Sequence, residues 1–351
     1  MSKLIYKYGN GKSTDLCQTD YNFKEQGAKT IVMNALNDET IISKFEGDIK
    51  LIREVDAKLN DDLFEFMINC KKNGISNIFV DSAHLLTEDQ VFSLFIGSKA
   101  LDIEVQLYGD RLYNGNLTSG TKRALELADD IEKINGIIND SHRSNIQFYY
   151  GAMNSSKSAK LLIKAKELEV KGLKVFTIKP RLDREELYIK SRIGISRKAD
   201  LVIDDDRLYT YGGFLHDCGF NYVFVDECQF LTEKQIIDLY NINKDYNIPI
   251  ECYGLKADFM TKTFPGSKKL LVLADDLIKL KTICNCENHP EAIFNARKDK
   301  FGNFVRNGEQ IVIDSGNYLS ICAKCYIEKV MGLNLNDSKK LVKELKKFNW
   351  S

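Results

Sequence analysis

Apolar residues in this chain occur alternately in short runs and at the spacing of a helical face. Residues 145–150 form a short apolar run, and residues 158–171 place apolar side chains three or four positions apart until Gly172 interrupts the pattern. These helical apolar side chains are Leu161, Leu162, Ala165 and Leu168. Further short apolar runs lie at 174–179, 222–226 and 250–253. Strands that alternate with helices predict an α/β fold, with a parallel sheet covered by helices on both faces.

The same pattern occurs twice, at an offset of 145 residues. Residues 74–90 and 219–235 are identical at eight of seventeen positions, and the offset also pairs residues 11–13 with 156–158. Two unrelated α/β units that share a generic strand, turn and helix are the alternative. An offset that persists over about 115 residues favours an internal duplication. Turn-forming residues at 136–145 predict the linker between the two copies.

A candidate phosphate-binding loop lies between a predicted strand and a predicted helix. Backbone N–H groups at a helix start bind phosphate oxygens, a lysine adds positive charge, and a serine hydroxyl ligates Mg²⁺. Lys157 and Ser158 are the candidates for the last two roles. Ser156 stands where the pattern G-x-x-x-x-G-K-[ST] has its second glycine, so an ordinary loop with a helix cap is the alternative. The candidate nucleotide-binding residues are Gly151, Ala152, Met153, Asn154, Ser155, Ser156, Lys157 and Ser158.

Two carboxylates end the apolar strand at 222–226. In a P-loop fold this strand lies beside the strand of the phosphate loop, so Asp226 can hold Mg²⁺ directly or through water. Glu227 would then face the reacting phosphate and take a proton from an attacking hydroxyl. We include the adjacent Cys228 and Gln229 among the candidate nucleotide-binding residues. A solvated acidic strand end is the alternative.

Four of the nine cysteines form two close pairs near the C-terminus. The pairs are Cys284 with Cys286 and Cys322 with Cys325. An odd number of cysteines and this spacing indicate reduced thiols that bind a metal rather than disulfides. Four thiolates leave no open position on a tetrahedral Zn²⁺, so we expect a structural zinc site. His289 is a further candidate ligand, although its spacing favours a surface histidine.

Composition and charge exclude several classes of protein. The chain has 351 residues, 44% of them hydrophobic, with 50 basic and 50 acidic residues, which excludes disordered and collagen-like chains. A net charge of zero, without a basic stripe interleaved with aromatic residues, argues against nucleic-acid binding. No apolar segment has the length of a signal peptide core or a membrane span. We therefore expect a cytoplasmic protein that binds neither membranes nor nucleic acids.

The neutral total conceals two halves of opposite charge. Residues 1–145 carry 17 Lys and Arg against 23 Asp and Glu, whereas residues 146–351 carry 33 against 27. The positive half contains the candidate phosphate loop, as an anionic triphosphate would favour.

From about Ile146 to Met331 the chain resembles the type II thymidine kinases. Their phosphate loop has the pattern G-x-M-x-S-[GS]-K-[ST], which accommodates Ser156. The family pattern K-P-x-x-D-x-R is similar to residues 179–184, one residue tighter here, and D-E-x-Q-F matches residues 226–230. Residues 191–196 (Ser-Arg-Ile-Gly-Ile-Ser) also resemble the family. The resemblance implies a RecA-like P-loop sheet, ATP as the phosphoryl donor and Glu227 as the catalytic base.

The resemblance also implies a lasso that covers the nucleoside, formed by residues 253–275. Phe259 and Phe264 are candidate apolar contacts for a pyrimidine ring, with core aromatics as the alternative. Tyr318 matches a family tyrosine that lies near the nucleoside. The preceding loop, from Asp314, is about one residue shorter than in the family, which leaves the base preference open between thymidine, deoxyuridine and other nucleosides.

The first copy resembles the same kinase domain without its chemistry. Residues 8–13 keep Lys12 and Ser13 but have lost about three loop residues, and Ser82 replaces the base glutamate after Asp81. No cysteine pairs follow. We expect a degenerate domain at 1–140, a catalytic P-loop domain at 141–280, a small zinc-binding subdomain at 281–331, and a basic C-terminal helix at 332–351.

These observations combine into one functional hypothesis. We expect ATP-dependent phosphorylation of the thymidine 5′-hydroxyl, giving dTMP and ADP, with Mg²⁺ and a structural Zn²⁺ as cofactors. Type II thymidine kinases are commonly tetramers, so we expect a homo-oligomer, either a tetramer or a dimer that forms a pseudo-tetramer. A nucleotide-binding regulatory protein without catalysis is the alternative.

Overall fold

The computed structural model describes residues 2–36, 38–44, 50–59, 62–134, 145–181, 187–204, 206–310 and 318–345. The chain divides into two compact units, one formed by Met1–Ile138 with Ala323–Ser351 and the other by Asn139–Cys322. Three sequence features lie outside the described residues: most of the predicted linker, residues 182–184 of the K-P-x-x-D-x-R motif, and the shortened loop at 314–317.

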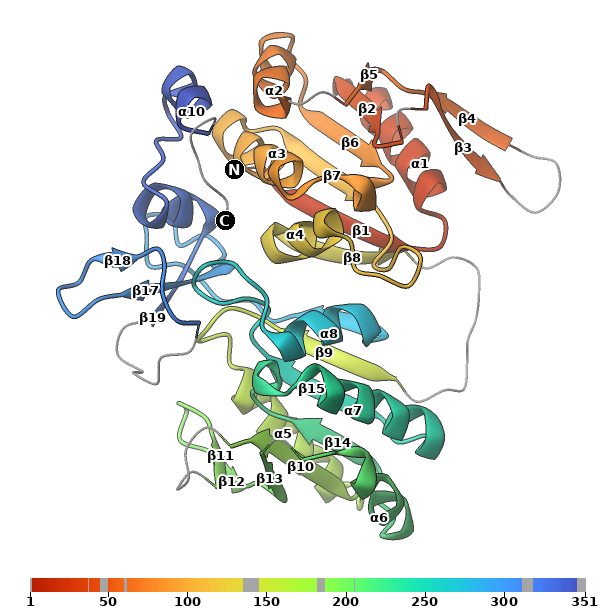
Figure 1. The fold of residues 1–351 in the computed structure, drawn as a ribbon, viewed down its shortest axis with the longest axis vertical. Helices are drawn as coiled ribbons and strands as arrows, with labels where there is room; N and C mark the ends of the chain where they lie inside the picture. The colour runs from red at the N-terminus through yellow and green to blue at the C-terminus, as the bar shows by residue number, and fades with distance from the viewer. Residues whose placement is uncertain are drawn as a thin grey trace. The chain divides into compact units, whose positions relative to one another are not determined.

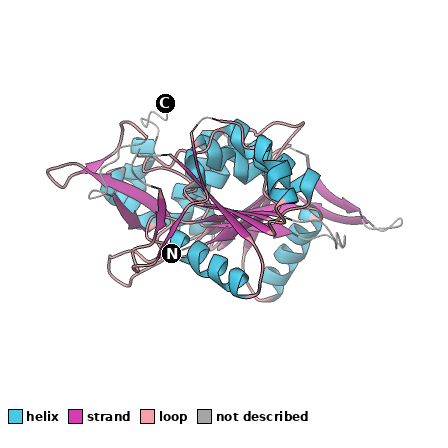
Figure 2. Ribbon diagram, turned by 90° about the horizontal axis from the view of Figure 1, so that it is seen from below, coloured by secondary structure: helices cyan, strands magenta, loops and turns pink. Residues whose placement is uncertain are grey.

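A six-stranded parallel sheet forms the centre of the second unit (Figure 1). Its strands, in spatial order, are β13 (Leu201–Ile203), β10 (Val175–Pro180), β14 (Tyr222–Val225), β15 (Ile250–Gly254), β9 (Ile146–Tyr150) and β16 (Asp276–Lys279). Its helices are α5 (Lys157–Val170), α6 (Gly212–Asp217), α7 (Glu233–Tyr246) and α8 (Pro265–Leu273). Figure 2 shows strands with helices on both faces. The predicted α/β fold is therefore confirmed.

The first unit repeats this sheet with the same strand order. Its strands are β5 (Ala57–Lys58), β2 (Thr30–Asn34), β6 (Asn77–Asp81), β7 (Glu104–Tyr108), β1 (Leu4–Gly9) and β8 (Asp130–Ile134). Its helices include α1 (Lys12–Glu25), α2 (Leu63–Lys72), α3 (Glu88–Leu101) and α4 (Ser119–Leu127). Each unit also carries an antiparallel hairpin, formed by β3 (Thr40–Lys44) with β4 (Lys50–Glu54) and by β11 (Tyr188–Lys190) with β12 (Ser196–Lys198). The identical strand order supports the duplication.

The strand register locates where the copies differ. Thr30 pairs with Asn77 in the first sheet as Val175 pairs with Tyr222 in the second, which keeps the offset of 145. Val105 and Ile250 also keep this offset, yet their partners Leu4 and Ile146 are only 142 positions apart. The first copy therefore lacks three residues between its first strand and its first helix, within the phosphate loop.

Core packing follows the predicted helical face. Leu161 and Ala165 of α5 are buried against Phe224 and Tyr253, and Leu168 packs at the margin of this cluster. In the first unit, Leu16 of α1 packs with Val32, Phe79 and Tyr108. The sequence Thr-Glu-x-Gln forms a capping box at the start of both α3 and α7, because the threonine and glutamine side chains each satisfy a free backbone N–H group.

The C-terminal part adds a small sheet and a helix. The antiparallel strands β17 (Phe294–Lys298), β18 (Phe304–Val305) and β19 (Tyr318–Ile321) precede α9 (Ala323–Cys325), a π-helical turn at Tyr326–Val330 and α10 (Ser338–Leu345). Asp337 caps α10, since its Oδ1 accepts a 3.0 Å hydrogen bond from the backbone N–H of Lys340. Helix α10 packs against α2 and buries Leu341 completely. Among the described residues, no helix has the length and apolar character needed to cross a membrane.

Candidate active site

The phosphate loop joins the end of β9 to the start of α5. A Cβ atom on Gly151 would lie 2.4 Å from Ser155 Oγ and 2.5 Å from the Leu280 carbonyl oxygen, so only glycine fits there. Ser156, which precedes α5, has a φ of 58°, in the left-handed region. Gly11 occupies the matching position of the first copy, with a φ of 85°. The position thus needs the backbone conformation that glycine adopts most easily, and serine holds it here at some strain.

Lys157 lies under this loop with its ammonium group buried. Its Nζ donates hydrogen bonds to the Ala152 carbonyl oxygen at 2.9 Å and to Ser155 Oγ at 3.2 Å. Burial lowers the pKa of Lys157, and the nearby carboxylates of Glu227 and Asp226 oppose that shift. Lys157 therefore lies beside the loop amides as a positive charge. Among the ion pairs of the described residues, none joins its ammonium group directly to a carboxylate.

Ser158 and Asp226 place three oxygen atoms together at the ends of neighbouring secondary-structure elements. The Ser158 hydroxyl donates to both carboxylate oxygens of Asp226, at distances of 3.1 and 3.0 Å. Asp226 is 4% exposed, and burial raises the pKa of its carboxyl group, with the charge of Glu227 adding to the effect. Divalent cations such as Mg²⁺ prefer hard oxygen ligands, which this hydroxyl and carboxylate provide. A cation would also stabilise the ionised form of the carboxylate, which burial disfavours.

Glu227 follows at the left-handed start of a short 3₁₀ turn, with a φ of 51°. Its Oε2 accepts a 2.5 Å hydrogen bond from Gln229 Nε2, and Gln229 Oε1 in turn accepts a 3.0 Å bond from the backbone N–H of Leu255. Gln229 is fully buried, so it fixes the orientation of the half-buried Glu227 carboxylate. Cys228 is also fully buried, and burial raises the pKa of its thiol, which keeps it neutral.

A cavity of about 280 Å³ brings the loop and the base together. Six predicted residues line it: Met153, Asn154, Ser156, Lys157, Ser158 and Glu227. The lining does not include the other six predicted residues of the described chain, which are Gly151, Ala152, Ser155, Asp226, Cys228 and Gln229. The arrangement puts an ammonium group, a hydroxyl and a carboxylate around a space of the size that phosphate groups need.

The hairpin β11–β12 supplies wall residues that sequence reasoning left without a role. Lys190 and Arg192 line the cavity together with Lys157, and the Arg192 guanidinium donates a hydrogen bond to Asn154 Oδ1. The signal was present in the segment Ser-Arg-Ile-Gly-Ile-Ser, but its spacing alone does not reveal that it folds onto the phosphate loop. Leu255, at the start of the predicted lasso, was missed for the same reason.

A larger groove of about 720 Å³ lies elsewhere, along the outer face of α5. Its lining combines apolar side chains, among them the exposed Ile163, Val170 and Ile195, with charged side chains of α5. None of the phosphate-loop residues or the paired carboxylates contributes to it. We assign the chemistry to the smaller cavity because, of these two cavities in the described part of the chain, it is the one that combines charged groups with the start of α5.

The three predicted nucleoside contacts lie outside the cavity lining of the described residues. Phe259 is 1% exposed and stacks under the Arg297 guanidinium, whose carbon lies 4.0 Å from the ring centre. Phe264 is 3% exposed and meets Phe230 edge to face at 5.5 Å. Tyr318 is half-buried at the start of β19. Such burial is what core aromatics show, and contact with a nucleoside stays a prediction for all three.

Asn295 connects the phosphate loop to the C-terminal sheet, a role that the sequence did not reveal. Its Oδ1 accepts a 2.8 Å hydrogen bond from the Met153 N–H, and its Nδ2 donates to the Ala257 carbonyl oxygen at 2.9 Å. The Ser320 hydroxyl donates to the Met153 carbonyl oxygen. Strands β17 and β19 therefore hold the tip of the loop.

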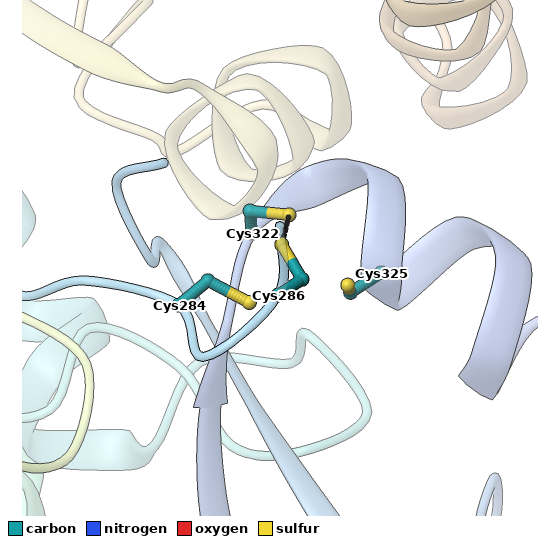
Figure 3. A group of neighbouring side chains, drawn as sticks. All are labelled: Cys284, Cys286, Cys322 and Cys325. Carbon is teal, nitrogen blue, oxygen red and sulfur yellow. Dashed lines mark hydrogen bonds between the residues drawn. The ribbon is translucent and has the colours of Figure 1, made fainter. Parts of the chain in front are cut away.

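The four cysteines of the two predicted pairs converge, as Figure 3 shows. Their sulfur atoms all lie within 4.8 Å of one another, and Cys286 Sγ is 3.8 Å from Cys322 Sγ. A tetrahedron with Zn–S bonds of about 2.3 Å has S···S edges of about 3.8 Å, so the thiols fit a zinc ion. His289 is exposed and lies outside the group, with Nδ1 3.3 Å from the Cys284 carbonyl oxygen.

A parallel sheet with a phosphate loop after one strand and paired carboxylates after its neighbour defines a P-loop phosphotransferase. The sequence profile of the family described as "Thymidine kinase" matches residues 4–143 and again residues 144–326. The chain therefore belongs to the thymidine kinase family and is a kinase. The two matches agree with the duplication seen in the sheets.

Individual relatives support the same assignment. The chain is similar to a thymidine kinase of Enterobacteria phage T4, with 39% identity over 188 residues, covering 53% of this chain and 96% of the relative. A thymidine kinase of Yersinia pseudotuberculosis is 36% identical over 191 residues, with coverage of 53% and 96%. A thymidine kinase of Legionella pneumophila strain Paris is 39% identical over 188 residues, with coverage of 52% and 89%. Each relative matches about half of this chain, as expected for a duplicated sequence.

Proposed function

We propose that the protein transfers the γ-phosphoryl group of ATP to the 5′-hydroxyl of thymidine, giving dTMP and ADP. The observation that carries the proposal is the single cavity in which Lys157, Ser158 and Glu227 meet, in a chain of the thymidine kinase family. The loop at 151–158 would hold the donor phosphates through its amides and Lys157. Ser158 and Asp226 would hold Mg²⁺, which supplies charge neutralisation between the phosphates.

Glu227 is proposed as the general base. Its carboxylate would accept the proton of the 5′-hydroxyl while the 5′-oxygen bonds to the γ-phosphorus, and the bond from that phosphorus to the β,γ-bridging oxygen breaks, which releases ADP. Gln229 would keep the carboxylate aimed at the substrate, since its amide holds Oε2 at 2.5 Å. Most of the rate enhancement would come from positioning and charge.

The C-terminal sheet has a supporting role in this proposal. A zinc ion on the four thiolates would hold the ends of the segment that carries β17 and β19, which bond to Met153 through Asn295 and Ser320. Phosphorylation of deoxyuridine, the contacts of Phe259, Phe264 and Tyr318 with the base, the homo-oligomer and the cytoplasmic location stay predictions.

An assay of purified full-length protein with radiolabelled thymidine and ATP tests the proposal. We expect labelled dTMP from the wild type and a loss of about 10²-fold or more in kcat for Glu227→Gln, which keeps the shape of the side chain but removes the base. Ser82→Gln, a change at the matching position of the first copy, is the control and should keep full activity. Full activity of Glu227→Gln would remove the base assignment. A wild type that binds ATP but forms no dTMP would support the regulatory alternative.

A further inference from the structure

Residues that follow β7 and β15 share one backbone arrangement. In the second copy, the backbone N–H of Leu255 donates to Gln229 Oε1 at 3.0 Å, and the Leu255 carbonyl oxygen accepts from the Ser267 hydroxyl at 2.5 Å. Both bonds hold residue 255 at the wall of the active cavity, where its side chain is apolar.

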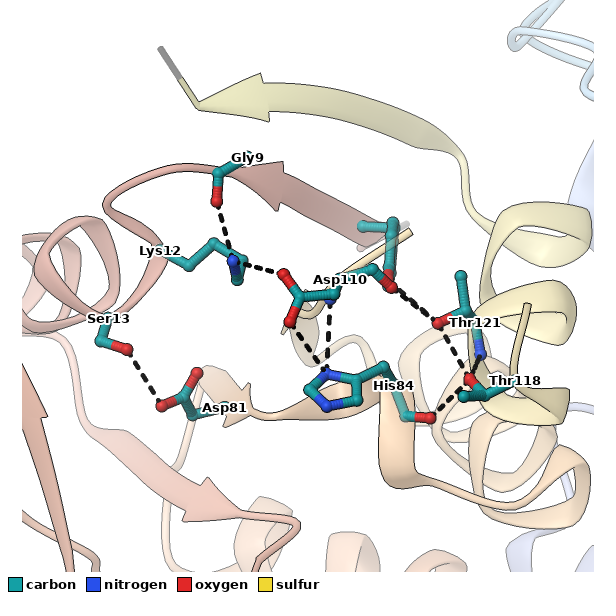
Figure 4. Close-up of polar contacts among 9 residues, drawn as sticks. Gly9, Lys12, Ser13, Asp81, His84, Asp110, Thr118 and Thr121 are labelled. Atoms are coloured by element: carbon teal, nitrogen blue, oxygen red, sulfur yellow. Dashed lines mark hydrogen bonds and ion pairs between the residues drawn. The ribbon is translucent and has the colours of Figure 1, made fainter. Parts of the chain in front are cut away.

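In the first copy, Asp110 occupies the position of Leu255, at the offset of 145. Its backbone N–H donates to His84 Nδ1 at 3.4 Å, and its carbonyl oxygen accepts from Thr121 Oγ1 at 2.9 Å and from the Tyr6 hydroxyl at 2.9 Å (Figure 4). His84 stands where Gln229 stands in the second copy. The scaffold is therefore preserved, and the side chain on it has changed from apolar to acidic.

The carboxylate of Asp110 reaches the phosphate-loop lysine of its own copy. Its Oδ1 lies 2.7 Å from Lys12 Nζ, which also donates to the Gly9 carbonyl oxygen at 2.8 Å. Its Oδ2 lies 3.9 Å from His84 Nδ1 (Figure 4). Lys12 is thus neutralised within the fold, whereas Lys157, among the described residues, donates its hydrogen bonds to oxygen atoms of its own loop.

We infer that in the first copy the Asp110 carboxylate takes the place that a donor phosphate takes in the second, so that this copy is closed to nucleotides by its own side chain. The inference rests on the proposal that Lys157 contacts the donor phosphates. A phosphate that approached Lys12 would meet a fixed negative charge within hydrogen-bond distance of the same ammonium group, and like charges at such a site repel. The loop is also three residues shorter, so fewer amides are available to compensate.

Two further features of the site persist in the closed copy, although the base glutamate does not. Ser13 Oγ donates to Asp81 Oδ2 at 3.3 Å, as Ser158 donates to Asp226, and Ser82 keeps a left-handed φ of 55° where Glu227 has 51°. The serine–aspartate pair and the backbone turn are therefore kept, whereas the surroundings of the lysine have changed.

The number of nucleotide sites on the full-length chain tests this inference. Equilibrium dialysis with radiolabelled ADP and Mg²⁺ should give one site per chain, because only the second copy has an open phosphate loop. Two sites per chain would overturn the inference. If the chain binds no ADP at all, the result would contradict the proposed function instead. The melting temperatures of variants at Lys12 and Asp110 would then decide the inference.

A double-mutant cycle supplies that second measurement. We expect Lys12→Met and Asp110→Leu each to lower the melting temperature by about 2–4 °C, because each leaves the partner charge unpaired. The double variant should lose no more than the larger single loss. Glu39→Gln is the matched control, since Glu39 pairs with Lys58 at 3.6 Å with both side chains mostly exposed, and it should leave the melting temperature unchanged. Strictly additive losses in the double variant would show that the two groups act independently and would overturn the inference.

Discussion

Substitution of Gly254 by alanine tests how tightly the base is oriented. A Cβ atom at this position would lie 2.5 Å from Gln229 Oε1 and 2.6 Å from Cys228 Sγ. Neither neighbour has room to move freely, because both side chains are fully buried. Gln229 would have to give up its place, and with it the bonds to Leu255 and to Glu227.

The expected size of the effect follows from these contacts. Overpacking of a buried site costs about 1–3 kcal/mol of stability. A catalytic group displaced by about 1 Å loses about 10²-fold in rate, which corresponds to about 2.7 kcal/mol of activation free energy. We therefore expect Gly254→Ala to lower the melting temperature modestly and kcat by about 10²-fold.

Gly109 provides a matched control in the same chain, at the offset of 145. Its added Cβ would lie 2.8 Å from the Tyr6 hydroxyl and 2.9 Å from the His84 backbone nitrogen, so Gly109→Ala should destabilise the protein to a similar degree. Its kcat at 25 °C should stay at the wild-type value, because the first copy carries no base. Wild-type kcat in Gly254→Ala, or an equal loss of kcat in both variants, would refute the argument that Gln229 orients Glu227.

Three further outcomes are expected. Cys322→Ser should lower the zinc content of the purified protein from one ion per chain, measured by metal analysis, and reduce its melting temperature, measured by calorimetry. Cys218→Ser, at an exposed cysteine outside the cluster, should change neither. Arg192→Ala should raise KM for ATP by about 10-fold, since Arg192 adds positive charge to the cavity, and an unchanged KM would exclude that role. The raised pKa of Asp226 means that the folded protein binds the carboxyl proton more tightly than the unfolded chain does. Without nucleotide or Mg²⁺, the free energy of unfolding should therefore fall as pH rises from about 4 toward neutrality. Asp226→Asn should reduce that fall and raise the melting temperature near pH 7.

Much of the fold was predictable because it depends on local periodicity. The predicted strand at 145–150 is β9 (Ile146–Tyr150), which begins one residue later, and the predicted helix at 158–171 is α5 (Lys157–Val170), which is shifted by one residue at both ends. Their apolar spacing fixes which face is buried, and tertiary packing does not alter it. The phosphate loop was predictable for the same reason, since its residues are contiguous.

Other parts of the site were not predictable from spacing. Arg192 forms a hydrogen bond with Asn154, 38 residues away in the sequence, and Asn295 forms one with Met153, 142 residues away. Each contact therefore depends on how separate elements are folded together. The burial of Phe259 and Phe264 was not predictable either, because the sequence left open whether they are core aromatics, and their contact with a nucleoside stays a prediction. Residue type alone could not distinguish these outcomes.

The sequence by itself determined the duplication, the alternation of strands and helices, the phosphate loop, the paired carboxylates and the four thiols, all of which follow from contiguous or closely spaced residues. Only the tertiary structure decided that the Asp110 carboxylate pairs with Lys12, whereas the matching Leu255 offers Lys157 no carboxylate. The physical reason is that parallel strands distant in the sequence end at one edge of the sheet, so the strand order determines which side chains from separate loops come within hydrogen-bond distance.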